Sequence, residues 1–457
     1  MNNTDFSSLP LDPALLENLS SLQYHRMTPI QAQSLPPILA GEDVIAQAKT
    51  GSGKTAAFAL GVLHRLRIRS FAVQSLVLCP TRELADQVAG EIRKLARTLP
   101  NIKVLTLCGG SPFGPQVGSL EHGAHIVVGT PGRIEDHLRK ETLTLRQVNT
   151  LVLDEADRML DMGFEEVLDT IVSYLPRTRQ NLLFSATFPD SIETIARRIM
   201  SSPVRITVEE PHDDTSIEQL FCPVNNRPRT EAVRLLLLHH RPDSALVFCN
   251  TKKAVKELTS ALNQAGLNTL ALHGDLEQRE RDQTMVMFAN KSASVLVATD
   301  VAARGLDIDA VDLVINYEIA RDRAVHTHRV GRTGRAGHSG KAITLYEEKE
   351  QFKLERLDSQ GRVTPTALPD ASLLQQPGYK ASMATLQIDG GKKQKVRRGD
   401  ILGALTAPGG LQGSEVGKIH LQDMRTYVAV RRPQARTALD LINKGKLKGR
   451  QFRARLL

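Results

Sequence analysis

The sequence predicts an α/β protein with two parallel-sheet domains in tandem and a small C-terminal α/β module. Short apolar runs alternate with helix-like stretches, and this plan occurs twice along the chain. Continuous apolar runs are typical of strands buried on both faces, as in a parallel sheet flanked by helices. A third observation, a basic C-terminal stretch with weaker apolar runs, sets the module apart. A chain of 457 residues has the length of two or three ordinary domains.

A polar, turn-rich segment at 209–216 separates the two sets of strand-like runs and has the composition of a linker. We therefore expect a first domain over 1–208 and a second domain over 217–360. The predicted strands of the first domain are 43–46, 75–78, 126–128, 150–153 and 181–184. Those of the second domain are 245–248, 269–272, 294–297, 313–315 and 342–345.

The C-terminal module is expected over 381–457, after a second linker at 361–380. From Lys380 onward, 17 Lys and Arg stand against 5 Asp and Glu, a net charge of +12 that leaves −3 for the rest of the chain. This asymmetry predicts a polyanion-binding appendage, with a well-solvated charged surface as the alternative. Its expected elements are strands at 384–388, 418–421 and 427–430, a helix at 434–443 and a last strand at 451–456.

Composition excludes several classes of protein. Apolar residues make up 41% of the chain and charged residues 24%, and no apolar run approaches the roughly 20 residues that span a bilayer. The first residues lack the basic start and apolar core of a secretory signal, so we expect a cytoplasmic protein. The four cysteines are scattered and form no CxxC pair, which favours small buried residues over zinc ligands or disulfides.

The strongest local signal is a phosphate-binding loop, Ala48 to Thr55, between a predicted strand and a predicted helix. Gly51 and Gly53 allow backbone N–H groups to converge on phosphate oxygens, aided by the helix N-terminus. Lys54 would reach the β- and γ-phosphates, and the Thr55 hydroxyl would ligate Mg²⁺. The generic motif begins with Gly where this chain has Ala48.

A second acidic centre follows the predicted strand at 150–153. Asp154 is placed to hold Mg²⁺, largely through water, and Glu155 to polarise the attacking water. Asp157 could in part be a helix cap, which is the structural alternative for acidic residues after a strand. Together with the phosphate loop, these residues predict an enzyme that hydrolyses ATP.

The chain resembles the DEAD-box RNA helicases of superfamily 2 over residues 6 to 345, with nearly every family motif in order. Beyond the two motifs above, the match includes PTRELA from Pro80, TPGR from Thr130, SAT from Ser185, VFCNT from Val247, ATDVAARGLDI from Ala298 and HRVGRTGR from His328. Two mild departures are Gln23-Tyr24, where the family usually has Gly before the aromatic residue, and Glu318, where Asp is usual. The resemblance implies two RecA-like domains, ATP and Mg²⁺ as cofactors, and RNA-dependent ATP hydrolysis.

The resemblance also implies a role for each matched residue. Gln31 offers the donor and the acceptor that adenine requires. Phe6 could stack on the base or be an ordinary core aromatic. Arg332 and Arg335 would act as arginine fingers once the second domain docks on the first, with surface ion pairs as the alternative. The other implied nucleotide contacts are Tyr24, Thr50, Gly51, Ser52, Gly53, Gly305 and Asp307; the coupling residues are Asp157, Ser185, Thr187 and His328; and the RNA contacts of the core are Pro80, Arg82, Gly109, Gly110, Thr130, Arg133, Asn250, Thr251, Gln278, Arg281, Thr299 and Arg304.

The element order of the C-terminal module resembles an RNA-recognition-motif-like fold. Its basic residues would form a phosphate-binding surface, and Tyr427 is a candidate for stacking on a base. With the stretch IDGGKK from Ile388, the module also gives the chain a resemblance to one bacterial branch of the family. That resemblance implies a 23S ribosomal RNA hairpin as the target, during assembly of the large ribosomal subunit. The alternatives are a general RNA chaperone without such a target, a DNA helicase, and a non-catalytic RNA clamp. The candidate phosphate contacts are Lys392, Lys393, Lys395, Arg397, Arg398, Lys446 and Lys448.

Overall fold

A computed structural model describes residues 4–48, 51–188, 190–208, 217–225, 227–303, 311–334, 340–357 and 364–457. The described residues form two compact units, one up to residue 208 and the other from residue 217 onward. The expected linker at 209–216 lies outside the described residues, as does the start of the expected linker at 361–380. No helix in the described part of the chain combines the length and the apolar character needed to cross a membrane.

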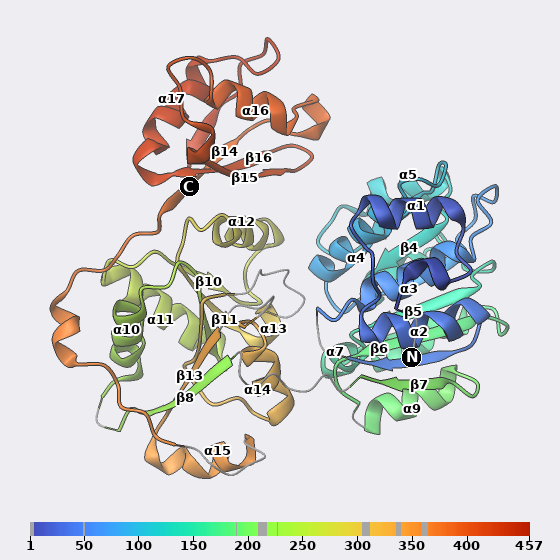
Figure 1. Cartoon of the computed structure of the whole chain (residues 1–457), viewed down its shortest axis with the longest axis horizontal. Helices are drawn as coiled ribbons and strands as arrows, with labels where there is room; N and C mark the ends of the chain where they lie inside the picture. The colour runs from blue at the N-terminus through green and yellow to red at the C-terminus, as the bar shows by residue number, and fades with distance from the viewer. Residues whose placement is uncertain are drawn as a thin grey trace. The chain divides into compact units, whose positions relative to one another are not determined.

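The first unit is built on a parallel sheet of seven strands, in the order β3-β4-β2-β5-β6-β1-β7. Figure 1 labels β4, β5, β6 and β7 among them. The central strands are buried along their whole length, which explains their continuous apolar runs. Their bounds are β1 Val44–Gln47, β2 Ser75–Leu78, β3 Val104–Leu107, β4 Ile126–Gly129, β5 Thr150–Asp154, β6 Gln180–Ser185 and β7 Val204–Thr207.

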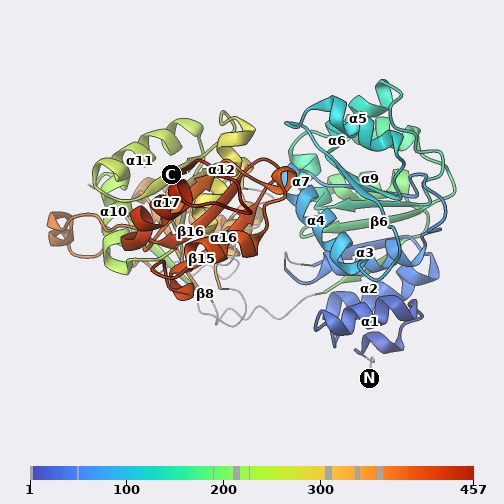
Figure 2. The same ribbon diagram turned by 90° about the horizontal axis from the view of Figure 1, so that it is seen from above.

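Helices cover both faces of this sheet. One apolar cluster joins the sheet to α1–α4, and a second joins the opposite face to α6–α9. Figure 2 shows α2 and α3 on one side of the sheet and α6 and α9 on the other. Because the strands are parallel, their carboxyl ends lie together along one edge of the sheet, between the two layers of helices. The helices are α1 Pro13–Ser21, α2 Pro29–Ala40, α3 Lys54–His64, α4 Arg82–Leu95, α5 Phe113–Glu121, α6 Pro131–Arg139, α7 Ala156–Asp161, α8 Glu165–Ser173 and α9 Asp190–Ile199.

The second unit contains a parallel sheet of six strands, in the order β10-β11-β9-β12-β13-β8, with α10 and α11 packed on one face. Its strands are β8 Ile217–Pro223, β9 Ala245–Cys249, β10 Thr269–Leu272, β11 Val295–Thr299, β12 Leu313–Asn316 and β13 Gly340–Tyr346. Its helices are α10 Arg229–His240, α11 Lys252–Gln264, α12 Gln278–Ala289, α13 Asp300–Ala303, α14 Arg323–Val330 and α15 Gln351–Leu357.

The C-terminal module has an antiparallel sheet in the order β15-β16-β14-β17, with α16 and α17 packed on one face. Its elements are β14 Met383–Ile388, α16 Arg398–Leu405, β15 Val416–Leu421, β16 Thr426–Arg431, α17 Ala435–Lys444 and β17 Ala454–Leu456. The predicted fold class, two parallel sheets followed by a small α/β module, is thereby confirmed. All four cysteines are buried, as expected.

Several motif residues lie at the start of a helix that follows a strand, and this position keeps them near the carboxyl end of that strand. The Thr81 hydroxyl accepts from the Leu84 N–H at the start of α4, and the Thr251 hydroxyl accepts from the Ala254 N–H at the start of α11. Gly53 precedes α3 in the left-handed conformation, with φ of 96°. Each motif therefore also ends a loop and begins a helix beside the carboxyl end of a strand.

Candidate functional site

The residues predicted for ATP hydrolysis and those predicted for RNA binding in the first unit both lie along the carboxyl edge of the first sheet. The phosphate loop follows β1, the acidic centre follows β5, and Ser185 ends β6, three strands that are neighbours in the sheet. The predicted RNA contacts follow β2, β3 and β4, which are neighbours in the adjoining half. Ligands of open parallel sheets bind at this edge. The strand order places the predicted nucleotide contacts in one half, called the nucleotide half below, and the predicted RNA contacts in the other, called the RNA half.

The phosphate loop has the geometry of an anion cradle. Gly51 and Gly53 adopt left-handed φ angles of 87° and 96°, and space around the Gly51 Cα is open. A side chain at Gly53 would meet the Gln31 amide, with a Cβ 2.5 Å from Nε2. The Ser52 hydroxyl is buried and has no hydrogen-bond partner among the residues that the structure describes. A buried polar atom without a partner is costly, so Ser52 fits a loop that accepts a polar ligand.

Lys54 is buried behind this loop, and its Nζ donates to the Ala48 carbonyl at 2.5 Å. Burial lowers its pKa, although the carboxylates of Asp154, Glu155 and Asp157 act in the opposite direction. The three carboxylates favour the charged form of Lys54. A charged ammonium would form a stronger hydrogen bond with a phosphate oxygen of a bound triphosphate than with the Ala48 carbonyl.

Asp154 and Glu155 form a buried acidic pair at the end of β5. Burial, together with the neighbouring charge of Glu155, raises the pKa of Asp154 above the usual aspartate range. A bound cation would remove this penalty, which suits Asp154 to a metal site. Glu155 takes a left-handed φ of 51°, and Arg158 Nη1 donates to its Oε2 at 2.6 Å. The strained left-handed backbone sets the direction of the Glu155 side chain, and the hydrogen bond from Arg158 fixes the position of its carboxylate.

Asp157 connects the acidic centre to the end of β6. Its Oδ2 accepts from the Thr187 hydroxyl at 2.7 Å and from the Thr187 N–H at 3.0 Å. Its own N–H points to the Ser185 hydroxyl at 3.4 Å. The predicted coupling residues of the first unit are therefore in direct contact.

The residues predicted to read adenine lie on α2 and the N-terminal segment. The Gln31 amide accepts from the Thr28 N–H at 2.9 Å and donates to the Gly53 carbonyl at 3.1 Å, so it ties α2 to the phosphate loop. Phe6 is only 3% exposed within the apolar cluster and meets the Tyr24 ring edge-on. This placement is the alternative stated for Phe6, a core aromatic, rather than a free stacking ring.

The RNA half of the edge presents exposed backbone and two arginines. Gly109 and Gly110 are exposed, and Gly110 has φ of 73°. Arg82 begins α4 and pairs with Asp86 at 3.6 Å, whereas the Arg133 guanidinium donates to the Ser111 carbonyl at 2.9 Å. Pro80 is buried, and Thr130 precedes the first residue of α6.

In the second unit, one buried arginine gathers the predicted motif residues. Arg329 is 1% exposed and holds the Asp300 carboxylate through two hydrogen bonds of 2.6 and 2.8 Å. It also donates to the Asn250 side chain at 2.7 Å and to the Glu318 carbonyl at 2.7 Å. The Glu318 carboxylate, at the position where the family usually has Asp, accepts from the Asn250 N–H at 2.6 Å. Sequence reasoning assigned no role to Arg329, although it lies inside the HRVGRTGR motif.

The remaining predicted residues of the second unit follow the same sheet edge. Arg281 donates to the Ala302 carbonyl at 2.7 Å, and Gln278 donates to Asp282 at 2.8 Å. Thr299 ends β11, and its hydroxyl accepts from the Ala302 N–H at 3.4 Å. His328 lies in α14, and Arg332 is buried just after it. Outside the described residues lie Thr50, Arg304, Gly305, Asp307 and Arg335.

The basic segments of the C-terminal module come together in space. Lys448 Nζ donates to the Lys395 carbonyl at 3.1 Å and lies 3.5 Å from the Asp400 carboxylate. The other predicted phosphate contacts are exposed on the same segments: Lys392, Lys393, Arg397, Arg398 and Lys446.

The prediction that Tyr427 stacks on a base does not fit the structure. Tyr427 is 2% exposed and lies on β16 beside Gln387 of β14, on the sheet face opposite the helices. On the same face, the Thr385 hydroxyl meets Ser292 at 2.5 Å and the Asn290 amide at 3.0 Å, both from the second parallel-sheet domain. Contacts with that domain occupy part of the face on which a stacking ring would be needed.

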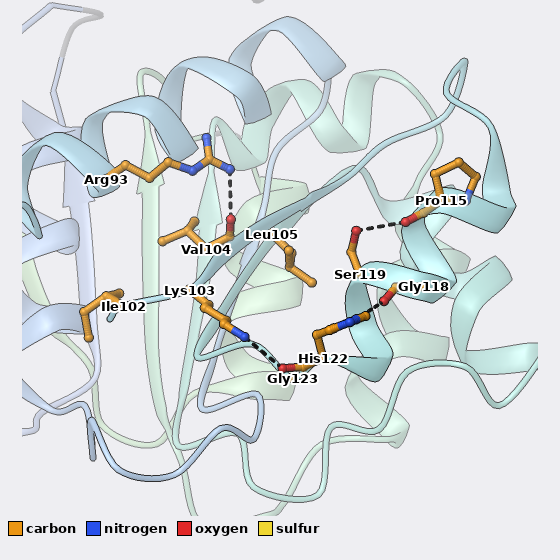
Figure 3. A pocket seen from close by; sticks show the side chains of 10 residues that line it. All are labelled: Arg93, Ile102, Lys103, Val104, Leu105, Pro115, Gly118, Ser119, His122 and Gly123. Carbon is orange, nitrogen blue, oxygen red and sulfur yellow. Dashed lines mark hydrogen bonds between the residues drawn. The ribbon is translucent and has the colours of Figure 1, made fainter. Parts of the chain in front are cut away.

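A groove of about 630 Å³ lies elsewhere in the first unit, beside the edge strand β3 (Figure 3). Its polar side chains are bonded to nearby main chain: Arg93 to the Val104 carbonyl, Lys103 to the His122 carbonyl and Ser119 to the Pro115 carbonyl. None of the predicted site residues lines it. The groove is therefore separate from the carboxyl edge that carries the predicted chemistry.

Fold and site together define an ATP-hydrolysing enzyme of the two-domain helicase class. Three family models match in sequence order: a DEAD/DEAH box helicase at 28–195, a helicase conserved C-terminal domain at 229–337, and a DbpA RNA binding domain at 385–456. The chain belongs to the DEAD-box family of ATP-dependent RNA helicases and carries the DbpA type of RNA-binding domain at its C-terminus.

Individual relatives agree with this assignment. The chain is 53% identical to the ATP-dependent RNA helicase DbpA of Escherichia coli, over 99% of this chain and 100% of the relative. It is 44% identical to CshA of Listeria monocytogenes, over 80% of this chain and 71% of the relative. Among solved structures, Saccharomyces cerevisiae Dbp5 bound to RNA and ADP BeF3 has a TM-score of 0.72 and 30% identity, covering 81% of this chain and 99% of that one.

Proposed function

We propose that this RNA helicase uses ATP hydrolysis to remodel short RNA duplexes in 23S ribosomal RNA during assembly of the large ribosomal subunit. The observation that carries the proposal is the C-terminal module, in which matched DbpA-type sequence coincides with two basic segments brought together at Lys395 and Lys448. The proposed RNA contacts of the two parallel-sheet domains address RNA backbone rather than base edges, so target choice requires a separate element. This activity belongs in the cytoplasm, where ribosomes are assembled.

The proposed division of labour follows the predicted domains, 1–208 for ATP binding, 217–360 for the arginine fingers and 381–457 for RNA targeting. Mg²⁺ would be held by Thr55 and, largely through water, by Asp154, and it would neutralise charge on the phosphates. Lys54 holds the β- and γ-phosphates, and Glu155 accepts a proton from the attacking water. Arg332 and Arg335 stabilise the charge of the transferring phosphoryl group.

ATP and RNA would each favour docking of the two parallel-sheet domains, so their binding should be mutually reinforcing. Hydrolysis then releases the RNA. The alternative is a general RNA chaperone, which would share the ATPase core but lack target preference. ATP hydrolysis in the presence of poly(A) or a 23S fragment carrying its peptidyl-transferase-region hairpins separates the two. A targeted enzyme is stimulated strongly by the 23S fragment alone, and a general chaperone equally by both RNAs.

Neutralising the basic segments should abolish target preference. In a variant with Lys393, Lys395, Lys446 and Lys448 all changed to Gln, we expect ATP hydrolysis to respond equally to the two RNAs. The slope of log affinity against log salt should also fall, by about 0.7 to 0.9 for each phosphate that the variant no longer neutralises. Filter binding over a series of salt concentrations, together with steady-state hydrolysis, measures both effects.

A control uses exposed lysines outside the module. Changing Lys253 and Lys349 to Gln removes charge from the second unit, where both side chains lie at the surface. This control should keep the preference of the unmodified enzyme. An unaltered preference in the module variant would remove these lysines from target selection and return the general chaperone as the better account.

A further inference from the structure

A buried hydrogen-bond relay anchors the chain beside Gly109 and Gly110, the exposed glycine pair of the RNA half. The carbonyl of Cys108, the residue immediately before Gly109, accepts from the Gln116 Nε2 at 3.1 Å. Gln116 lies on α5 and is 8% exposed. On the other side of the pair, the Ser111 carbonyl accepts from Arg133. The two glycines thus lie between two anchored carbonyls.

The second step of the relay reaches α6, the helix that carries Arg133. His137 is fully buried, and its Nε2 lies 3.0 Å from the Gln116 Oε1. The Gln116 NH₂ group donates to the Cys108 carbonyl, so the Gln116 Oε1 faces the His137 ring. Since an amide oxygen can only accept, the His137 Nε2 must be the donor. Nδ1 then accepts from the Thr142 hydroxyl at 2.8 Å. Burial, with the nearby charge of Arg133, lowers the pKa of His137 to about 4, in agreement with a neutral ring.

An aromatic contact closes the same cluster. The Phe113 ring, in the first turn of α5, stacks on the His137 ring with centroids 4.2 Å apart and planes 18° apart. Lys140 Nζ lies 4.1 Å from the centre of the Phe113 ring, and the Arg133 guanidinium lies 5.7 Å from it. Stacking and cation–π contact fix the ring orientation that the hydrogen bond requires.

We propose that Gln116 and His137 are positioning residues for RNA, which set the Gly109–Gly110 backbone at a fixed place relative to Arg133. The inference rests on the proposed RNA contacts of Gly109, Gly110 and Arg133. A glycine pair has large conformational freedom, and a loop that must be ordered at the moment of binding loses affinity. The relay orders it beforehand, through groups that do not touch RNA.

The test measures the RNA concentration that half-saturates ATPase stimulation in the full-length protein. His137→Met keeps the size and the apolar contact with Phe113 but removes the donor. We expect about a tenfold higher half-saturating RNA concentration, the fold change of a lost hydrogen bond to a buried group. His137→Gln, whose amide nitrogen can take the place of Nε2, should return the value to near that of the unmodified enzyme.

The matched control is His125, a second fully buried histidine of the same unit. Its ring also lies beside a phenylalanine, Phe71, with centroids 4.8 Å apart and planes tilted by 53°, and it is bonded to the Lys103 N–H and the Ile68 carbonyl. His125 precedes β4, however, at the opposite end of the strand from the carboxyl edge. His125→Met should lower the melting temperature without raising the half-saturating RNA concentration. An equal rise in the half-saturating RNA concentration of both methionine variants would mean that the effect comes from lower stability, and it would overturn the proposal.

Two further variants keep each outcome decisive. If His137→Met does not fold, Gln116→Leu interrupts the same relay from α5 and should give the same rise. An unchanged half-saturating RNA concentration in a folded relay variant overturns the proposal. Arg133→Met tests the underlying contact: if it has no effect on RNA, the proposed RNA half is itself wrong. If Arg133→Met weakens RNA binding and the relay variants do not, only the positioning role fails.

Discussion

Changing Glu155 to Gln should leave ATP binding intact and reduce the rate of ATP hydrolysis by about 10²- to 10⁴-fold, the usual contribution of a general base. The amide keeps the size of the side chain and can still accept from Arg158, so the strained backbone at Glu155 loses little support. Ser52 and Lys54, the proposed phosphate ligands, are untouched. Single-turnover hydrolysis in saturating RNA and equilibrium binding of a fluorescent ATP analogue measure the two effects separately.

Glu141 supplies the control for this substitution. It is an exposed glutamate just beyond α6, and it has a left-handed φ of 55°, close to the 51° of Glu155. Glu141→Gln therefore makes the same chemical change at a residue with a similar left-handed φ, and hydrolysis should stay within about twofold of the unmodified rate. Normal hydrolysis in Glu155→Gln would remove that carboxylate from the chemistry, and Asp154 or Asp157 would become the next candidates.

Changing Arg329 to Met should destabilise the second unit strongly. Removing one partner of a buried ion pair costs about 3–5 kcal/mol, because the other charge is left without compensation. We expect the lower end of that range, since the Asp300 side chain is 21% exposed. Calorimetric unfolding of the full chain should show an earlier transition. The double variant Asp300→Leu, Arg329→Met removes both charges and should regain part of the stability without regaining RNA-stimulated hydrolysis.

Arg198 is the control for the buried arginine. It also joins two carboxylates, Glu165 and Asp169, but on the surface of the first unit, with its side chain 40% exposed. Surface ion pairs contribute about 0–1 kcal/mol, so Arg198→Met should change the unfolding transition little. Equal effects of the two substitutions would contradict the role given to burial at Arg329.

The sequence located the interior of both parallel sheets better than their edges. The three strands that it did not predict, β3, β7 and β8, are all edge strands. Each is partly exposed, and β7 reads Val-Arg-Ile-Thr, so none gives the continuous apolar run of a strand buried on both faces. Helix α16, Arg398–Leu405, was also missed, because basic residues and glycines hide its short apolar face.

Site residues can be recognised from the sequence where they form a contiguous motif, whereas contacts that depend on packing cannot. The phosphate loop and the Asp154–Asp157 centre are contiguous motifs, so their residue types were sufficient. Arg329 binds Asp300, Asn250 and Glu318, which follow three different strands, and neither its burial nor its partners can be predicted from one motif. For Tyr427, alternation along a strand gives the face on which a side chain lies but not what covers that face.

The predicted coupling residues Asp157 and Thr187, which are hydrogen-bonded, would join ATP hydrolysis to RNA remodelling at the carboxyl edge of the first sheet. Thr187→Val keeps the shape of the side chain and removes the hydroxyl donor. The decisive measurement is the number of short RNA duplexes separated per ATP hydrolysed, compared between this variant and the unmodified enzyme. We predict that ATP hydrolysis continues while duplexes separated per ATP fall about tenfold, as expected for the removal of one hydrogen bond to a charged group. An unchanged ratio, whether both rates fall together or neither changes, would contradict the account.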